Sequence, residues 1–374
     1  MKYSMEEKEA GMTGFRRELI EKSLPSPGNN YRMKKVIEKS RKGQEVTLVF
    51  LGASITMKRS EENDTGFATL SYQFYRDTYG KPDKVRYINS GLNGTSSTLG
   101  LIRVDRDVLN HKPDIVFVEF AVNDSKDSLN REVFESLILR LLHSESRPAV
   151  VLLFMTSETG YSCQGHMQVI GEHYQLPMIS IRDAVLSEIE EGRLGWKDYS
   201  DDNIHPNEKG NRLVAECIAH YFRTVDSMPL QRENAFPSQP FFGSSYQMMK
   251  LLDADSADII SLGSFHKEVF WGSFKSRWIH RQGSGNESLK LKLKCRSLFA
   301  VYKENNNEMA GSAQVIVDGW IMGAMTSYRI LGWGNAVSIF IFGDETVGEH
   351  TLEVKMAPGD EGKEFTLLGF GYCV

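Results

Sequence analysis

Short apolar runs alternate with helical patterns between residues 46 and 225, and this alternation constrains the fold more than any other feature of the sequence. The runs are rich in β-branched and aliphatic residues, as in VTLVFL at Val46–Leu51 and DIVFVEF at Asp114–Phe120. Continuous apolar runs separated by helices are typical of parallel strands that are buried on both faces. The sequence therefore predicts a three-layer α/β domain over residues 46–226, built on a mainly parallel, five-stranded sheet.

The same pattern sets approximate bounds for the elements of this domain. The expected strands are Val46–Leu51, Val85–Ile88, Asp114–Phe120, Ala149–Met155 and Pro177–Ile181. The expected helices are Phe67–Tyr79, Leu99–Leu109, Arg131–His143, Gln164–Tyr174, Asp183–Glu191 and Glu208–Thr224. Because the carboxyl ends of parallel strands meet at one edge of a sheet, the loops that follow these strands should gather there.

The alternation stops near Val225, and a different pattern follows. Residues 227–246 contain three prolines, a glycine and several serines, which is the composition of a linker. Beyond it, SLKLKLKC at Ser288–Cys295 places leucines on one face of a strand and lysines on the other. Further short strands are expected at Ala313–Val317, Val337–Phe342, His350–Met356 and Phe365–Gly371. The sequence therefore predicts an all-β sandwich over residues 247–374.

Residues 1–45 carry basic and acidic side chains in interleaved order. Two helical patterns, Phe15–Lys22 and Tyr31–Arg41, are separated by the helix-breaking sequence PSPG. We expect a helical arm that packs on the first domain, because mixed charge does not favour a nucleic-acid or membrane surface.

Composition excludes several classes of protein. The chain has 374 residues, enough for two domains, and a net charge of −5 that disfavours nucleic-acid binding. Its four cysteines form no CxxC pair, so neither a disulfide framework nor a zinc site is indicated. No apolar stretch approaches the roughly 20 residues of a membrane span, and the N-terminus lacks the apolar core of a signal peptide. We therefore expect a cytoplasmic protein that has no membrane partner.

Polar residues follow three of the predicted strands. Ser54 lies in the turn GASIT after the first strand, where it is either a nucleophile or the cap of a helix. Gly94 lies in NSGLNG after the second strand, in a loop that either approaches a ligand or is an ordinary connection. Asn123 lies in AVND after the third strand, and it either stabilises an oxyanion or, like Asp124, caps the next helix.

A fourth polar group, DDNIHPNEKG at residues 201–210, precedes the last helix of the domain. Asp202 lies three residues before His205, near enough to accept the Nδ1–H and fix the tautomer of the ring. Asp202, His205 and Glu208 are alternatively a metal site, but it would lack the second histidine that most such sites contain. Together, the four groups supply a nucleophile, oxyanion donors and an acid–base pair, which is the inventory for acyl transfer.

The order GASIT, NSGLNG, VND and DNIH resembles the SGNH, or GDSL-type, hydrolases, whose four sequence blocks centre on Ser, Gly, Asn and His. The resemblance covers residues 46–225 and implies a flavodoxin-like catalytic domain. It implies that Ser54 is the nucleophile, that His205 is the general base and that Asp202 orients His205. It also implies an oxyanion hole formed by the N–H groups of Ser54 and Gly94 and the side-chain amide of Asn123.

Two positions depart from the pattern of this family. Ala53 stands where many members have Asp, and Ala121-Val122 stands where many have Gly-x or Gly-Gly. Neither departure removes a catalytic group, and both are expected to reshape the site near the acyl and leaving groups.

The two-domain arrangement resembles bacterial carbohydrate acetylesterases, specifically mannan-oligosaccharide deacetylases with a C-terminal, jelly-roll-like domain similar to a carbohydrate-binding module. The resemblance implies a serine esterase that removes O-acetyl groups from acetylated oligosaccharides without a cofactor or a metal. Aromatic rings suit sugar stacking, and the candidate substrate-binding residues are Trp196, Tyr199, Trp320 and Trp333. Two alternatives stay open, a lipid or thioester acylhydrolase and a non-catalytic carbohydrate-binding protein on a hydrolase scaffold. The sequence also leaves open the sugar and a homo-oligomeric state.

Overall fold

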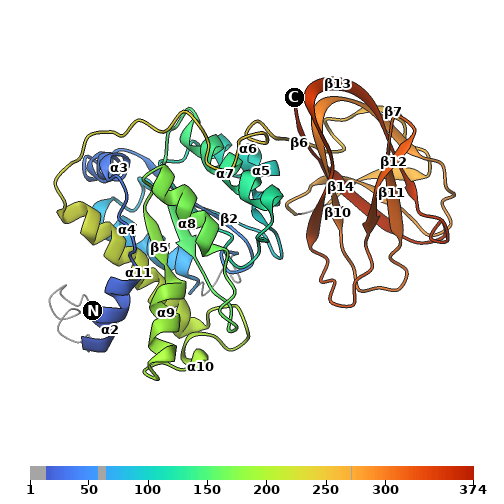
Figure 1. Ribbon diagram of the computed structural model, residues 1–374. Coiled ribbons are helices and arrows are strands. Elements are labelled where there is room, and N and C mark those ends of the chain that lie inside the picture. The colour runs from blue at the N-terminus through green and yellow to red at the C-terminus, as the bar shows by residue number, and fades with distance from the viewer. Residues whose placement is uncertain (1–13, 58–64, 271) are drawn as a thin grey trace. The chain divides into compact units, whose positions relative to one another are not determined.

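The computed structural model describes residues 14–57, 65–270 and 272–374, which separate into two compact units. The first unit comprises the described residues up to Leu92 together with Asp107–Ser244. The second comprises Asn93–Arg106 and Ser245–Val374. Figure 1 shows helices around a sheet in the first unit and mainly strands in the second. The short segment 93–106, which follows the second strand, thus groups with the C-terminal unit, although the sequence pattern places it in the α/β domain.

The first unit contains the predicted parallel sheet. Its strands are β1 (Val46–Gly52), β2 (Val85–Gly91), β3 (Ile115–Glu119), β4 (Ala149–Phe154) and β5 (Met178–Ser180). They pair in the order β2-β1-β3-β4-β5, and every pairing is parallel. The α/β prediction is confirmed, and β1, which ends next to Ser54, is an interior strand with β2 on one side and β3 on the other.

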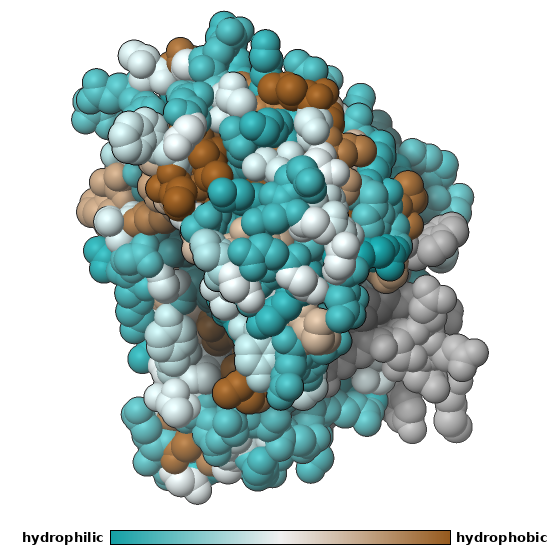
Figure 2. Space-filling model, turned by 90° about the vertical axis from the view of Figure 1, so that its right-hand side faces the viewer, coloured by the Kyte–Doolittle hydropathy of each residue, from teal (hydrophilic) through white to brown (hydrophobic). Residues whose placement is uncertain are grey.

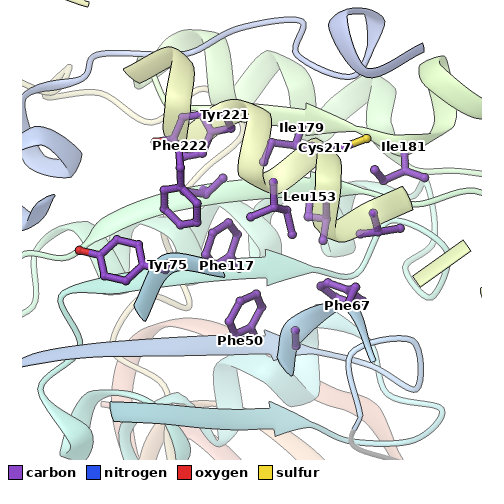
Figure 3. Close-up of a cluster of buried hydrophobic side chains, with 14 of the residues drawn as sticks. Phe50, Phe67, Tyr75, Phe117, Leu153, Ile179, Ile181, Cys217, Tyr221 and Phe222 are labelled. Carbon is purple, nitrogen blue, oxygen red and sulfur yellow. The ribbon is translucent and has the colours of Figure 1, made fainter. Parts of the chain in front are cut away.

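Helices cover this sheet because its apolar residues alternate between two buried faces. The helices are α2 (Gly14–Lys22), α3 (Tyr31–Arg41), α4 (Phe67–Tyr79), α7 (Ser128–Leu142), α8 (Gln164–His173), α9 (Ile181–Glu190), α10 (Trp196–Tyr199) and α11 (Glu208–Ser227). On one face, Phe50 and Phe117 stack with ring centroids 4.6 Å apart, and Phe222 of α11 packs edge-on against Phe117 (Figure 3). Leu51 and Val118, which alternate with them, are buried as well. The sheet is therefore buried on both faces, as its continuous apolar strands predict.

The single helix expected at Leu99–Leu109 is wrong. The chain forms α5 (Ser97–Ile102), α6 (Val104–Asp107) and a 3₁₀ turn, η1 (Leu109–His111). The break falls at Arg103, whose backbone leaves the helical region while its N–H contacts the carbonyls of Leu99 and Leu101. Arg103 is itself buried, and a periodic apolar pattern does not reveal such a break at a charged residue.

The proline-rich segment after α11 forms neither a helix nor a strand, and it packs on the helices of the first unit. Asn30 exchanges hydrogen bonds with Gln231 and donates to the carbonyl of Pro229. The carboxylate of Glu135 in α7 accepts hydrogen bonds from the backbone N–H groups of Phe241, Phe242 and Gly243. This segment is thus held by specific polar contacts along much of its length.

The second unit is an antiparallel β-sandwich, as predicted. Its main strands are β10 (Leu289–Lys303), β11 (Ser312–Val317), β12 (Trp320–Thr326), β13 (Ala336–Met356) and β14 (Phe365–Cys373), and the shorter ones are β6 (Lys250–Leu252), β7 (Asp258–Ser261), β8 (Phe265–Val269) and β9 (Ser276–His280). The main path runs β12-β11-β13-β10-β14-β9-β8, with β6 on β14 and β7 on β10. Leu289, Leu291 and Leu293 are buried in the core, as their alternation with lysines predicts.

The surface is mostly hydrophilic on the face shown in Figure 2, where hydrophobic residues form small, separate groups. Within the residues that the structure describes, no helix has both the length and the apolar character needed to cross a membrane. The predicted cytoplasmic location stays a prediction.

Candidate active site

Ser54 lies in a tight turn directly after β1. The turn is closed by a hydrogen bond from the N–H of Met57 to the carbonyl of Ala53, and the side-chain amide of Asn89 in β2 donates to the carbonyl of Thr56 over 2.8 Å. At Gly52, an added Cβ would lie 2.2 Å from Thr56 Oγ1, so the turn packs too closely for any other residue there. The close packing fixes the turn that carries the Ser54 hydroxyl.

His205 and Asp202 lie in the loop before α11, and this loop brings them to Ser54. His205 Nε2 is 2.9 Å from Ser54 Oγ, and His205 Nδ1 is 2.8 Å from Asp202 Oδ2. The three side chains form one hydrogen-bonded chain, with the carboxylate at one end and the hydroxyl at the other. The structure thus brings together three residues that span about 150 positions of the sequence.

The Asp202 carboxylate is stabilised in its charged form. Its Oδ1 accepts hydrogen bonds from the backbone N–H groups of Ile204 and His205, at 2.7 and 2.6 Å. Desolvation raises the pKa of Asp202, but these two backbone bonds and the imidazole outweigh it and lower the pKa to about 2. Asp202 is therefore ionised at neutral pH and favours the tautomer that carries a proton on Nδ1 of His205.

Two buried residues, Ser200 and Trp196, support this loop through hydrogen bonds to its backbone carbonyls. The sequence alone did not indicate this role for either residue. The hydroxyl of Ser200 is 2.6 Å from the carbonyl oxygen of His205 and 2.9 Å from that of Asp202. Trp196 donates its Nε1–H to the same Asp202 carbonyl over 2.6 Å. The end of the loop is fixed as well, because the side chain of Asn207 caps α11 by accepting a hydrogen bond from the N–H of Gly210.

The structure does not support the predicted substrate-binding role of Trp196 and Tyr199. Both belong to the core of the α/β unit, and Tyr199 is 1% exposed. Trp196 is buried as well, so neither residue offers much surface to a sugar. Their aromatic character serves packing, and Trp196 additionally orients the loop that carries Asp202 and His205.

The proposed oxyanion groups follow the neighbouring strands. Asn123 is half-buried in the turn after β3, where its N–H bonds to the carbonyl of Phe120. Gly94 follows β2 with a φ of +64°, a conformation that favours glycine, and it belongs to the segment that groups with the second unit. The oxyanion hole stays a prediction.

The alternative of a metal site at Asp202, His205 and Glu208 has no support in this geometry. Both ring nitrogens of His205 are engaged, one by Asp202 and the other by Ser54. The carboxylate of Glu208 pairs with Arg212 instead. Within the described ranges, no three His, Cys, Asp or Glu side chains are grouped so that they could hold a metal ion.

Part of the chain matches a known protein family. Residues 50–213, which include Ser54, Asn123, Asp202 and His205, match the model of the GDSL-like lipase/acylhydrolase family. This segment therefore resembles the GDSL-like lipases and acylhydrolases. A search of curated protein sequences found no match to the chain.

Among solved structures, the chain resembles a two-domain protein over nearly its full length. That protein is described as a two-domain esterase active on acetylated mannans. The two share 26% sequence identity with a TM-score of 0.85, and the match covers 94% of this chain and 98% of the other. A second structure of such an esterase, co-crystallised with mannopentaose, matches with the same identity and TM-score and covers 94% of this chain and 97% of its own. The likeness therefore includes the β-sandwich as well as the hydrolase domain.

Proposed function

We propose that this protein is a serine esterase that removes O-acetyl groups from acetylated oligosaccharides, with acetylated manno-oligosaccharides as the first candidates. The observation that carries the proposal is the hydrogen-bonded chain of Ser54, His205 and Asp202. A serine hydroxyl is a weak nucleophile by itself, and an adjacent imidazole that is oriented by a carboxylate activates it.

In the first step, Ser54 Oγ attacks the acetyl carbonyl while His205 Nε2 takes its proton. The positive charge that develops on the imidazole is stabilised by Asp202, which stays ionised because of its low pKa. His205 then gives the proton to the leaving sugar oxygen, and an acetyl ester remains on Ser54. In the second step, water that is deprotonated by His205 releases acetate and restores Ser54.

The negative charge on the carbonyl oxygen needs donors during both steps. We propose the N–H groups of Ser54 and Gly94 and the side-chain amide of Asn123 for this role. Such donors stabilise the transition state more than the substrate, because the charge exists only in the transition state.

The substrate class is supported by two independent features. The solved structures that resemble this chain over both domains are described as esterases active on acetylated mannans, one of them with mannopentaose. In the second unit, the side chains of Trp320 and Trp333 are each 76% exposed, whereas Trp278 is fully buried in the core. Exposed indole rings suit stacking on sugar rings, so Trp320 and Trp333 stay our candidates for oligosaccharide contacts.

Acetate release from acetylated mannan, xylan and pectin oligosaccharides tests the proposal, with the Ser54→Ala variant as control. We expect fastest release from mannan fragments and none from the variant. The same enzyme is assayed on p-nitrophenyl esters of increasing acyl length, where we expect the acetate to be the best substrate. Activity that rises with acyl length would favour a lipid or thioester acylhydrolase, and an intact wild-type protein whose Ser54 resists a fluorophosphonate would favour a non-catalytic binding protein.

A further inference from the structure

A buried carboxylate adjoins the turn that carries Ser54. Glu119 is the last residue of β3, is aligned in register with Gly52 of β1, and is 1% exposed. The hydroxyl of Thr56, two residues after Ser54, donates to Glu119 Oε2 over 3.0 Å. We propose that Glu119 is a positioning residue that holds Ser54 in its reactive geometry through Thr56, an inference that rests on the proposed esterase function.

The contact acts on the same residue of the turn as a hydrogen bond from the other neighbouring strand. The carbonyl of Thr56 is bound by Asn89 from β2, and its hydroxyl is bound by Glu119 from β3. Strand β1 lies between β2 and β3, so the turn is fixed from both neighbouring strands. Loss of either bond leaves Thr56 held from one side, and Ser54 follows because it shares the same short turn.

The surroundings of Glu119 make its charge sensitive to pH near neutrality. Burial is the largest influence on its pKa and raises it, as does the charge of Asp124, while hydrogen bonds from Thr56 and from the backbone of Ala53 lower it, and the resulting pKa is about 7. Tyr199 of α10 also interacts with Glu119, and burial and this carboxylate both raise the pKa of Tyr199. In the described part of the chain, Oε1 has no hydrogen-bond partner.

The charge matters because a hydrogen bond to a carboxylate is about twice as strong as one to a neutral acceptor. Above its pKa, Glu119 is ionised and holds Thr56 firmly. Below it, the proton is taken up, most simply on the unpartnered Oε1, and Oε2 becomes the weaker acceptor of a neutral acid. Acid therefore loosens the turn that carries Ser54.

The Glu119→Gln variant fixes the neutral state at every pH, since the amide oxygen still accepts from Thr56. The test measures the rate at which a fluorophosphonate labels Ser54, which reports nucleophile activation without any sugar. We expect the wild type to react about tenfold faster than Glu119→Gln near pH 8.5 and about equally fast near pH 5.5, because both are then neutral at this position. A wild-type to variant ratio that stays constant with pH would refute the proposal, even if the variant is less stable.

Glu135→Gln is the matched control. Glu135 is also a fully buried carboxylate of the α/β unit, but it binds Tyr174 and the backbone of residues 241–243. Its removal should lower the melting temperature without making the labelling ratio depend on pH. A pH-dependent ratio in this control as well would assign the effect to buried charge in general and overturn the specific role of Glu119.

Two variants of Thr56 keep the test decisive if Glu119→Gln does not fold. Thr56→Val removes the donor and should label about tenfold more slowly near pH 8.5, whereas Thr56→Ser should retain the wild-type rate. If Thr56→Val labels at the wild-type rate, the contact does not position Ser54. Failure of the proposed esterase function is separate from all these outcomes, because the wild-type protein would then show no labelling that Ser54→Ala abolishes.

Discussion

Replacement of Ser200 by alanine tests how the loop that carries His205 and Asp202 is held. The buried hydroxyl of Ser200 contacts the carbonyl oxygens of both residues, whereas Trp196 Nε1 contacts only that of Asp202. In Ser200→Ala, the Asp202 carbonyl keeps a donor and the His205 carbonyl loses one. We expect the backbone of His205 itself to shift, since the freed group belongs to that residue.

The size of the effect follows from these contacts. Loss of a hydrogen bond lowers the free energy of unfolding by about 1 kcal/mol. The loss rises to about 3 kcal/mol where the acceptor is left buried without any partner, water included. Because His205 is only half-buried, water reaches its backbone and the free energy of unfolding should fall by about 1–2 kcal/mol, a decrease in Tm of about 2–8 °C. A displacement of about 1 Å at a reacting group costs about 10²-fold in rate. His205 N–H stays bound to Asp202, so we expect a smaller loss, about tenfold in kcat with little change in KM.

A double-mutant cycle with Trp196→Phe makes this reasoning refutable. The single Trp196→Phe change leaves the Asp202 carbonyl bound to Ser200, so each single variant keeps one donor on that oxygen. The double variant removes both, and its loss in kcat should exceed the product of the single losses by an amount equivalent to about 0.5–3 kcal/mol. Steady-state kinetics on p-nitrophenyl acetate and thermal unfolding supply the measurements. A Ser200→Ala enzyme with a lower Tm and an unchanged kcat would show that this hydroxyl supports the fold alone.

Three further outcomes are expected. Asn123→Ala should lower kcat by about 10²–10³ at nearly constant KM, measured on p-nitrophenyl acetate, and an unchanged kcat would remove it from the oxyanion hole. Trp320→Ala and Trp333→Ala should raise KM for acetylated oligosaccharides but not for p-nitrophenyl acetate; a parallel change on both substrates would argue against sugar stacking. Gly52→Ala forces its new methyl group onto Thr56 and should reduce fluorophosphonate labelling about tenfold or more, and wild-type labelling would contradict the tight turn.

The parts of the molecule that the sequence predicts are those in which local pattern and tertiary environment agree. β1, β3 and β4 are buried on both faces, so their apolar runs need no knowledge of partners to be recognised. The topology then requires the loops after these strands to share one edge of the sheet, and Ser54 lies in the first of these loops. His205, in the loop before α11, meets Ser54 within hydrogen-bond distance.

Two strands of the second unit, β7 and β12, escape this reasoning because neither has a continuous buried face. Every residue of β7 is at least partly exposed, and most of β12 is exposed as well. Without alternating burial, the sequence of neither strand shows a period of two. Both strands form by backbone pairing, β7 with β10 and β12 with β11. The expected strands Val337–Phe342 and His350–Met356 are parts of the single strand β13, whose exposed middle residues hide its continuity.

The supporting residues of the site could not be read from residue type, because their roles depend on contacts between distant segments. Trp196 and Tyr199 are aromatic residues near a catalytic loop, and that description fits a pocket wall as well as a core. Glu119 indicates a supporting role more strongly than either aromatic residue does. A charged residue inside a strand that is otherwise apolar must find a partner or shift its pKa, since burial of an unpaired charge is costly. In this fold it does both, at the strand end next to the nucleophile, and its partner is in the turn that carries Ser54. A lone acidic residue at the carboxyl end of a buried parallel strand is thus a reason to examine the turn beside it, even where no motif includes it.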